Sequence, residues 1–166
     1  MKSRILLVGT AAIALAALQP LTAASTTSSV TMSATVSATA KLSVSAATLT
    51  FPNADPDTTP SIAATEGAVT VTAKAKTSTG STVTLTLLSG ADLTSGTDTI
   101  AISNMTWTVS GAGFVAGTMN KTTAQTVASW TNSGNRTGTQ TFALANSWSY
   151  PTGSFSATAT YTLTAP

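Results

Sequence analysis

Residues 30–44 read VTMSATVSATAKLSV, and this stretch decides the class of fold. Serine, threonine or lysine alternates with an apolar residue throughout, the apolar positions being Val30, Met32, Ala34, Val36, Ala38, Ala40, Leu42 and Val44. Neighbouring side chains on a β-strand point to opposite faces, so a period of two predicts one long strand, or two in succession, with one apolar face.

The same period returns along the rest of the chain. It occurs over residues 69–75 and 83–87, which we expect to form a hairpin around Gly80, and again over residues 155–163. No segment after residue 24 has the i, i+3, i+4 apolar spacing of a helix. Strands joined by Gly, Asn and Pro turns predict an all-β fold, an antiparallel immunoglobulin-like β-sandwich of about seven or eight strands.

The first 24 residues differ from everything that follows. Lys2 and Arg4 precede an uncharged apolar run over residues 5–18, and small residues end at Ala24. This is the layout of a secretory signal peptide, and the run is shorter than the roughly 18–20 residues that span a bilayer. We therefore expect a signal peptide over 1–24, an N-terminal extension over 25–38 and a β-sandwich domain over 39–166. The expected location is secreted or on the cell surface, reached through the periplasm.

Removal of the signal peptide changes the charge of the protein. The whole chain has a net charge of +2, and Lys2 and Arg4 account for that excess. Five basic and five acidic residues remain, so the mature chain is neutral. Nucleic-acid binding relies on clustered Lys and Arg, so we expect no nucleic-acid partner. We also expect no stable insertion into a membrane.

The residue types that most catalytic sites need are missing. The sequence has no His and no Cys, which excludes Ser-His-Asp and Cys-His arrangements and zinc sites built from these ligands. The few acids lie in or beside predicted turns, and the cluster Asn53 to Asp57 suits a turn better than a calcium loop. We expect no enzymatic activity, no cofactor and no metal.

Three aromatic residues are candidate ligand contacts. Trp130, Trp148 and Tyr150 lie near predicted turns, where aromatic rings can stack on sugars or anchor a partner. Trp107 is in phase with Met105 and Val109, which predicts a core position for it. These residues leave open a second hypothesis, a secreted carbohydrate- or surface-binding β-sandwich module.

Both ends of the mature chain resemble one known family. Residues 30–51 (VTMSATVSATAKLSVSAATLTF) and 153–166 (GSFSATATYTLTAP) are similar to the first and last strands of spore coat protein U-like and archaic chaperone-usher pilus subunits. The resemblance covers roughly a third of the mature chain. Many such subunits carry a disulfide near the first strand, and this chain has no cysteine.

The resemblance implies a way of assembling. In those pili each subunit is an incomplete sandwich, and the N-terminal strand of the next subunit fills its groove. Here the inserted side chains would be Val30, Met32, Ala34 and Val36. The implied function, our first hypothesis, is an exported cell-surface structural subunit, pilus- or coat-like. Its partners would be further copies of this chain or related surface subunits, together with a periplasmic chaperone and an usher. The alternative is that residues 30–44 form an ordinary first strand of their own domain.

Overall fold

The computed structural model describes residues 26–166, and the predicted signal peptide lies outside the described residues. The described chain divides into two units between Ala34 and Thr35, and the second unit is Thr35–Pro166. We call the second unit the β-domain. It contains every strand of the described chain and no α-helix, so the prediction of an all-β protein is confirmed.

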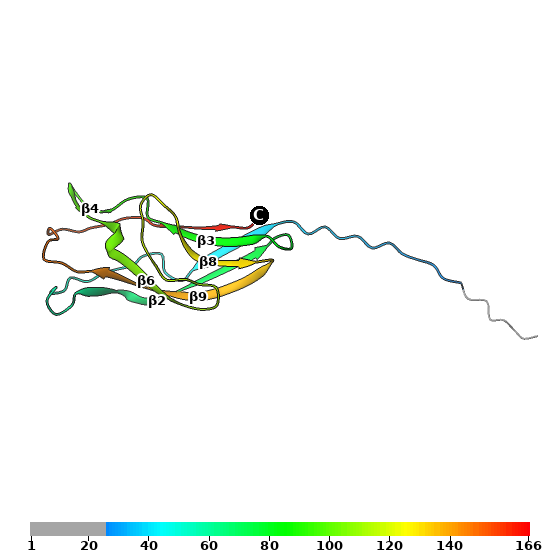
Figure 1. Ribbon diagram of the computed structural model, residues 1–166, viewed down its shortest axis with the longest axis horizontal. Coiled ribbons are helices and arrows are strands. Elements are labelled where there is room, and N and C mark those ends of the chain that lie inside the picture. The colour runs from blue at the N-terminus through cyan, green and yellow to red at the C-terminus, as the bar shows by residue number, and fades with distance from the viewer. Residues whose placement is uncertain (1–25) are drawn as a thin grey trace, which may run out of the picture. The chain divides into compact units, whose positions relative to one another are not determined.

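The β-domain consists of antiparallel sheets (Figure 1). The main sheet has the order β1 (Thr39–Val44), β2 (Ser61–Lys76), β9 (Gly134–Ala145), β6 (Met105–Ser110) and β7 (Gly117–Thr118). The second sheet has the order β10 (Thr160–Thr164), β3 (Thr82–Leu88) and β8 (Gln125–Thr131). A short ribbon pairs β4 (Leu93–Ser95) with β5 (Asp98–Ile100), and a single 3-10 turn, η1 (Ile102–Asn104), precedes β6.

Alternating side chains of the two larger sheets fill one hydrophobic core. Val71 of β2, Leu85 of β3 and Val127 of β8 are fully buried, and they belong to the same cluster of apolar side chains. Trp107 is 2% exposed and packs near Phe142 of β9, with the ring centroids 6.3 Å apart. Its Nε1 donates to the Val115 carbonyl at 2.9 Å, so the indole is both buried and satisfied, as its phase in the sequence predicts.

The turn η1 explains the change of phase in the sequence between Ile102 and Met105. A single 3-10 turn at residues 102–104 lets Ile102 and Met105 both point into the core, although they are three residues apart. The sequence predicts a bulge or a tight corner at this place, and the structure has a corner.

Two predictions about strand pairing are wrong. Residues 30–38 lie outside any strand, because only Thr39–Val44 has a partner to pair with, in β2. β2 and β3 do not form a hairpin either, since β2 pairs with β1 and β9 whereas β3 pairs with β10 and β8. The chain around Gly80 therefore crosses from one sheet to the other.

Candidate binding groove

A long groove, lined by both apolar and polar side chains, opens between the segment that follows β1 and the segment that precedes β10. β1 is the last strand of the main sheet on one side, and β10 is the last strand of the second sheet. Two segments border the gap between them, residues 44–52, which we call the first rim, and residues 153–161, the second rim. The enclosed volume is about 1460 Å³, and the floor is made of core side chains that include Val69, Leu87 and Phe142.

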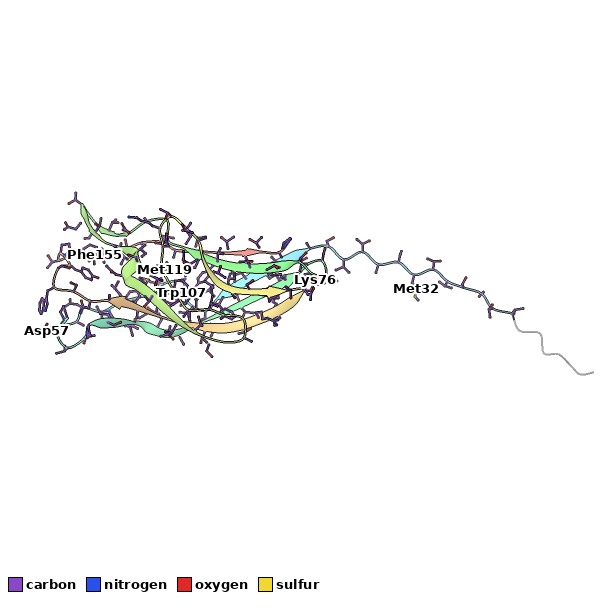
Figure 2. All side chains as sticks on the ribbon, in the orientation of Figure 1. Met32, Asp57, Lys76, Trp107, Met119 and Phe155 are labelled. Carbon is purple, nitrogen blue, oxygen red and sulfur yellow. The ribbon has the colours of Figure 1, made fainter. Side chains whose placement is uncertain are left out.

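The groove leaves part of the core uncovered. Almost all the apolar side chains that pack on the core but stay partly exposed come from β1, β10 and the segments next to them, namely Leu42, Val44, Ala46, Leu49, Phe51, Tyr150, Phe155, Tyr161, Leu163 and Ala165. A complete core normally covers such residues from both sides. The second rim is visible in Figure 2 through Phe155, which projects near the end of the domain that also carries Asp57.

The backbone of each rim is bonded on its outer side only. On the first rim, the Ser45 amide donates to the Thr70 carbonyl at 2.9 Å and the Thr50 carbonyl accepts from the Thr65 amide at 2.9 Å, both toward β2. On the second rim, Ser156 exchanges hydrogen bonds with Thr94 of β4. In residues 26–166 no backbone hydrogen bond joins the two rims. On the sides that face one another, the two rims therefore have backbone groups without a backbone partner, and both rims are extended segments that lie mostly outside the strands.

A polar contact crosses the core beside this gap. The Tyr161 hydroxyl on the second rim donates to Oε1 of Gln140 at 2.5 Å, which ties β10 to the central strand of the main sheet. Gln140 is fully buried, and its Nε2 has no hydrogen-bond partner among the described residues. Burial raises the pKa of Tyr161 to about 12, so the phenol stays protonated and remains a donor at physiological pH.

At one end of the groove, loops are held by side-chain hydrogen bonds. Nδ2 of Asn146 donates to the carbonyls of Ala54 at 3.1 Å and Thr59 at 3.0 Å. Oδ1 of Asp55 accepts the Asp57 amide at 2.9 Å, so the Asn53–Asp57 cluster forms the predicted turn. No group of three candidate metal ligands occurs in the part of the chain that the structure describes.

The three candidate aromatic residues are not gathered in one place. Trp130 is 7% exposed and belongs to the core, with the Arg136 guanidinium 5.8 Å from its ring centroid, so its faces are not accessible. Trp148 is 71% exposed, and its Nε1 donates to Oδ1 of Asp57 at 3.0 Å. Trp148 and Tyr150 both border the groove. Burial raises the pKa of Tyr150, while a hydrogen bond with Asn104 lowers it.

The candidate donor side chains are exposed. Val30, Met32 and Val36 are 82%, 91% and 75% exposed, and Ala34 is exposed as well. Four of the five large hydrophobic side chains that are left exposed in the described chain lie either in this segment or at Trp148. Sequence analysis missed the rim residues Phe51, Phe155 and Tyr161 as site residues, because an alternating strand does not reveal whether its neighbour is present.

Comparison with family models, with curated proteins and with solved structures found no match. The search for a membrane-spanning helix within residues 26–166 found none of sufficient length and hydropathy.

Proposed function

We propose that this chain is an exported structural subunit, pilus- or coat-like, which assembles by donor-strand exchange. Its fold is then an immunoglobulin-like sandwich that lacks one strand, and the missing strand comes from residues 30–36 of another copy. The observation that carries this proposal is the gap itself, a groove over the hydrophobic core that is bordered by two segments whose facing backbone groups are unpaired. A related surface subunit could donate the strand as well, and a periplasmic chaperone and an usher would handle the open subunit before assembly.

The dimensions of the candidate donor and of the groove agree. Val30 to Val36 covers six residue steps, which is about 20 Å in an extended strand. Phe155 to Tyr161 on the second rim covers the same number of steps. Val30, Met32, Ala34 and Val36 share one face of such a strand, so all four side chains can enter the groove while the serines and threonines between them stay outside.

The energetics require pairing as well as burial. Burying Val30, Met32 and Val36 contributes about 1.5–3 kcal/mol for each side chain. Ordering the backbone of seven residues costs about 1–2 kcal/mol per residue, and this total is as large as the gain from burial or larger. Hydrogen bonds between the inserted strand and a rim contribute about 0.5–1.5 kcal/mol each, and with this contribution the sum favours binding. An inserted strand pairs on both sides here, because each rim offers one unpaired edge.

Peptide binding and truncation test the proposal together. A synthetic peptide covering residues 26–38 is added to a chain that lacks residues 1–38, and binding and thermal stability are measured. We expect binding, a higher melting temperature, and oligomers only from the chain that retains its own extension. A matched peptide with Met32→Asp and Val36→Asp keeps the length and the serine-threonine face. Equal stabilisation by the two peptides, or by neither, would refute donor-strand assembly.

A second candidate function is a secreted module that binds carbohydrate or another surface. The observation in its favour is Trp148, which is 71% exposed and whose orientation is fixed by the hydrogen bond to Asp57. An indole held in this way presents a flat apolar face for stacking on a sugar ring. Trp148→Ala tests it by glycan binding, with the buried Trp130 left intact. Loss of binding at unchanged stability supports this function, and a wild-type chain that binds no glycan refutes it.

A further inference from the structure

The charged residues of the β-domain are sorted to its two ends. Asp55 and Asp57 precede β2, and Glu66 is the sixth residue of β2. Asp98 begins β5, whose ribbon with β4 lies toward the same end of the domain (Figure 1). We call this end, with these four acids, the acidic end. Lys41, Lys74, Lys76 and Arg136 form the basic end, where β1 begins. Figure 2 shows Asp57 and Lys76 at opposite ends of the domain.

The remaining two charges of the described chain cancel each other. Nζ of Lys121 lies 2.5 Å from Oδ2 of Asp92, and together with the Ile102 amide it lowers the pKa of that carboxyl. The acidic end therefore carries four negative charges and the basic end four positive charges, with little net charge between them.

This separation does not stabilise the domain itself. β2 has 16 residues, so its first and last residues are about 50 Å apart at about 3.3 Å per residue, and Glu66 and Lys74 on this strand are about 26 Å apart. Charges in solution are screened beyond about 8–10 Å at physiological ionic strength, so the ends do not attract one another within one molecule. Lys41 and Lys74 are moreover directly opposite on neighbouring strands, an arrangement that destabilises a sheet. Attraction within one molecule therefore does not account for the charge sorting.

The direction of the strands brings unlike ends together in an assembly. The chain enters the β-domain at the basic end, because Thr39 pairs with Lys76. β10 runs toward that same end, since Thr160 pairs with Leu88, Thr164 pairs with Thr84, and the Thr77 hydroxyl donates to the terminal Pro166 carbonyl. A donor strand antiparallel to β10 runs toward the acidic end of the acceptor. Its own domain then follows with the basic end first.

The connection between inserted strand and domain is short. Val36 to Thr39 is three residue steps, which span at most about 10 Å. The basic end of the donor is consequently held within about one screening length of the acidic end of the acceptor. A donor strand parallel to β10 would instead bring two basic ends together.

We propose that the acidic end of one copy and the basic end of the next form an electrostatic docking interface that guides end-to-end assembly. This inference rests on the proposed donor-strand function and adds a second surface to it. The interface acts mainly on the rate and the orientation of encounter, because rim charges steer association more than they hold a complex together.

Two sets of neutralising substitutions test the interface in the mature chain. One set is Lys41→Gln, Lys74→Gln and Lys76→Gln, all at exposed positions. The other is Asp55→Asn, Asp57→Asn and Asp98→Asn, which keeps an Oδ1 acceptor for the Asp57 amide and for Trp148. A control, Ser110→Glu, Thr126→Glu and Thr162→Glu, makes the same charge change as the lysine set at exposed positions in the middle of the strands.

The rate of oligomer formation is followed by light scattering at about 20 mM and about 500 mM salt. Each neutralised chain should assemble at least about tenfold more slowly than the parent chain at low salt, and the salt dependence should largely disappear. Combining the two sets should slow assembly little further, because the attraction depends on the product of the two end charges. The control should retain the parent chain's salt dependence.

The peptide of residues 26–38 separates this inference from the function on which it rests. It carries no charged side chain, so its binding to the acceptor should be independent of salt and of both substitution sets. If the peptide binds but the neutralised chains assemble as fast as the control, the docking interface is refuted and donor-strand assembly stands. If neither peptide binding nor oligomers occur, the proposed function itself is refuted.

Discussion

Tyr161→Phe removes the hydroxyl that satisfies a buried amide. In the wild-type chain this hydroxyl donates to Oε1 of Gln140 at 2.5 Å, and Nε2 of the same residue already lacks a partner. The substitution leaves both polar atoms of a fully buried glutamine without a hydrogen bond. A buried polar group without a hydrogen-bond partner costs about 1–3 kcal/mol, so we expect the free energy of unfolding to fall by about 2 kcal/mol. For a domain of this size that corresponds to about 6–10 °C in melting temperature.

A second variant shows whether the glutamine is the cause. Gln140→Leu in the Tyr161→Phe background replaces both partners with apolar groups of similar shape, which is often nearly neutral. The double variant should therefore regain most of the stability lost by Tyr161→Phe alone. Tyr150→Phe is the matched control, since this tyrosine also borders the groove but does not contact Gln140.

Urea unfolding of the monomer, monitored by tryptophan fluorescence, measures these differences. Equal losses for Tyr161→Phe and Tyr150→Phe would contradict the argument. A double variant whose loss of stability equals the summed losses of Tyr161→Phe and Gln140→Leu would also contradict the argument, because the effects of substituting two contacting residues should be strongly non-additive.

The same contact predicts a dependence on alkaline pH. Burial raises the pKa of Tyr161 in the folded state to about 12, against 10.0 for an unperturbed tyrosine. The folded state then retains a proton that the unfolded state has lost, so the contribution is complete below pH 10 and disappears as the pH rises toward 12. Tyr161→Phe should lack this decline. A variant that loses stability over the same range as the parent chain would assign the decline to another group.

Three further predictions concern other parts of the β-domain. A Cβ at Gly138 would lie 2.5 Å from the Phe114 ring, so Gly138→Ala should cost about 1–3 kcal/mol in chemical denaturation, and an unchanged midpoint would contradict the packing. The hydrogen bond from the Thr50 amide lowers the pKa of Glu66, so stability should decline as the pH falls through this pKa, and Glu66→Gln should reduce that decline in an acid titration. Trp148→Ala should leave the melting temperature almost unchanged because the side chain is exposed, and a large drop would show that it is part of the core.

The strand content of the chain could be predicted from the sequence, but the pairing could not. A period of two at residues 69–75 and 83–87 reports only that each segment has an apolar face, and both do face the core as β2 and β3. Which strand lies beside which depends on contacts far apart in the chain, such as β2 with β9. The short connection and the shared period predict a hairpin. In the structure the two strands lie in different sheets, and both contribute side chains to the core.

The candidate site is likewise only partly predictable from the sequence. The apolar alternation of residues 30–36 predicts a strand, whereas in the structure these residues lie outside any strand and their side chains are exposed. The rims that could receive them look like ordinary strand segments in the sequence, since Phe51, Phe155 and Tyr161 are in phase with their neighbours. The sequence pattern does not indicate that the backbone beside these residues lacks a neighbouring strand.

By itself the sequence determined that the protein is built of antiparallel strands and that it has neither His nor Cys for the usual catalytic and metal sites. These properties follow from residue types and short-range periodicity, which do not depend on which distant segments pack together in the fold. Only the tertiary structure decided that Trp130 is buried while Trp148 is exposed, that the groove is open, and that acidic and basic side chains of the β-domain lie toward opposite ends. Each of these depends on which distant segments become neighbours, because burial, edges and electric fields are properties of the assembled sheets.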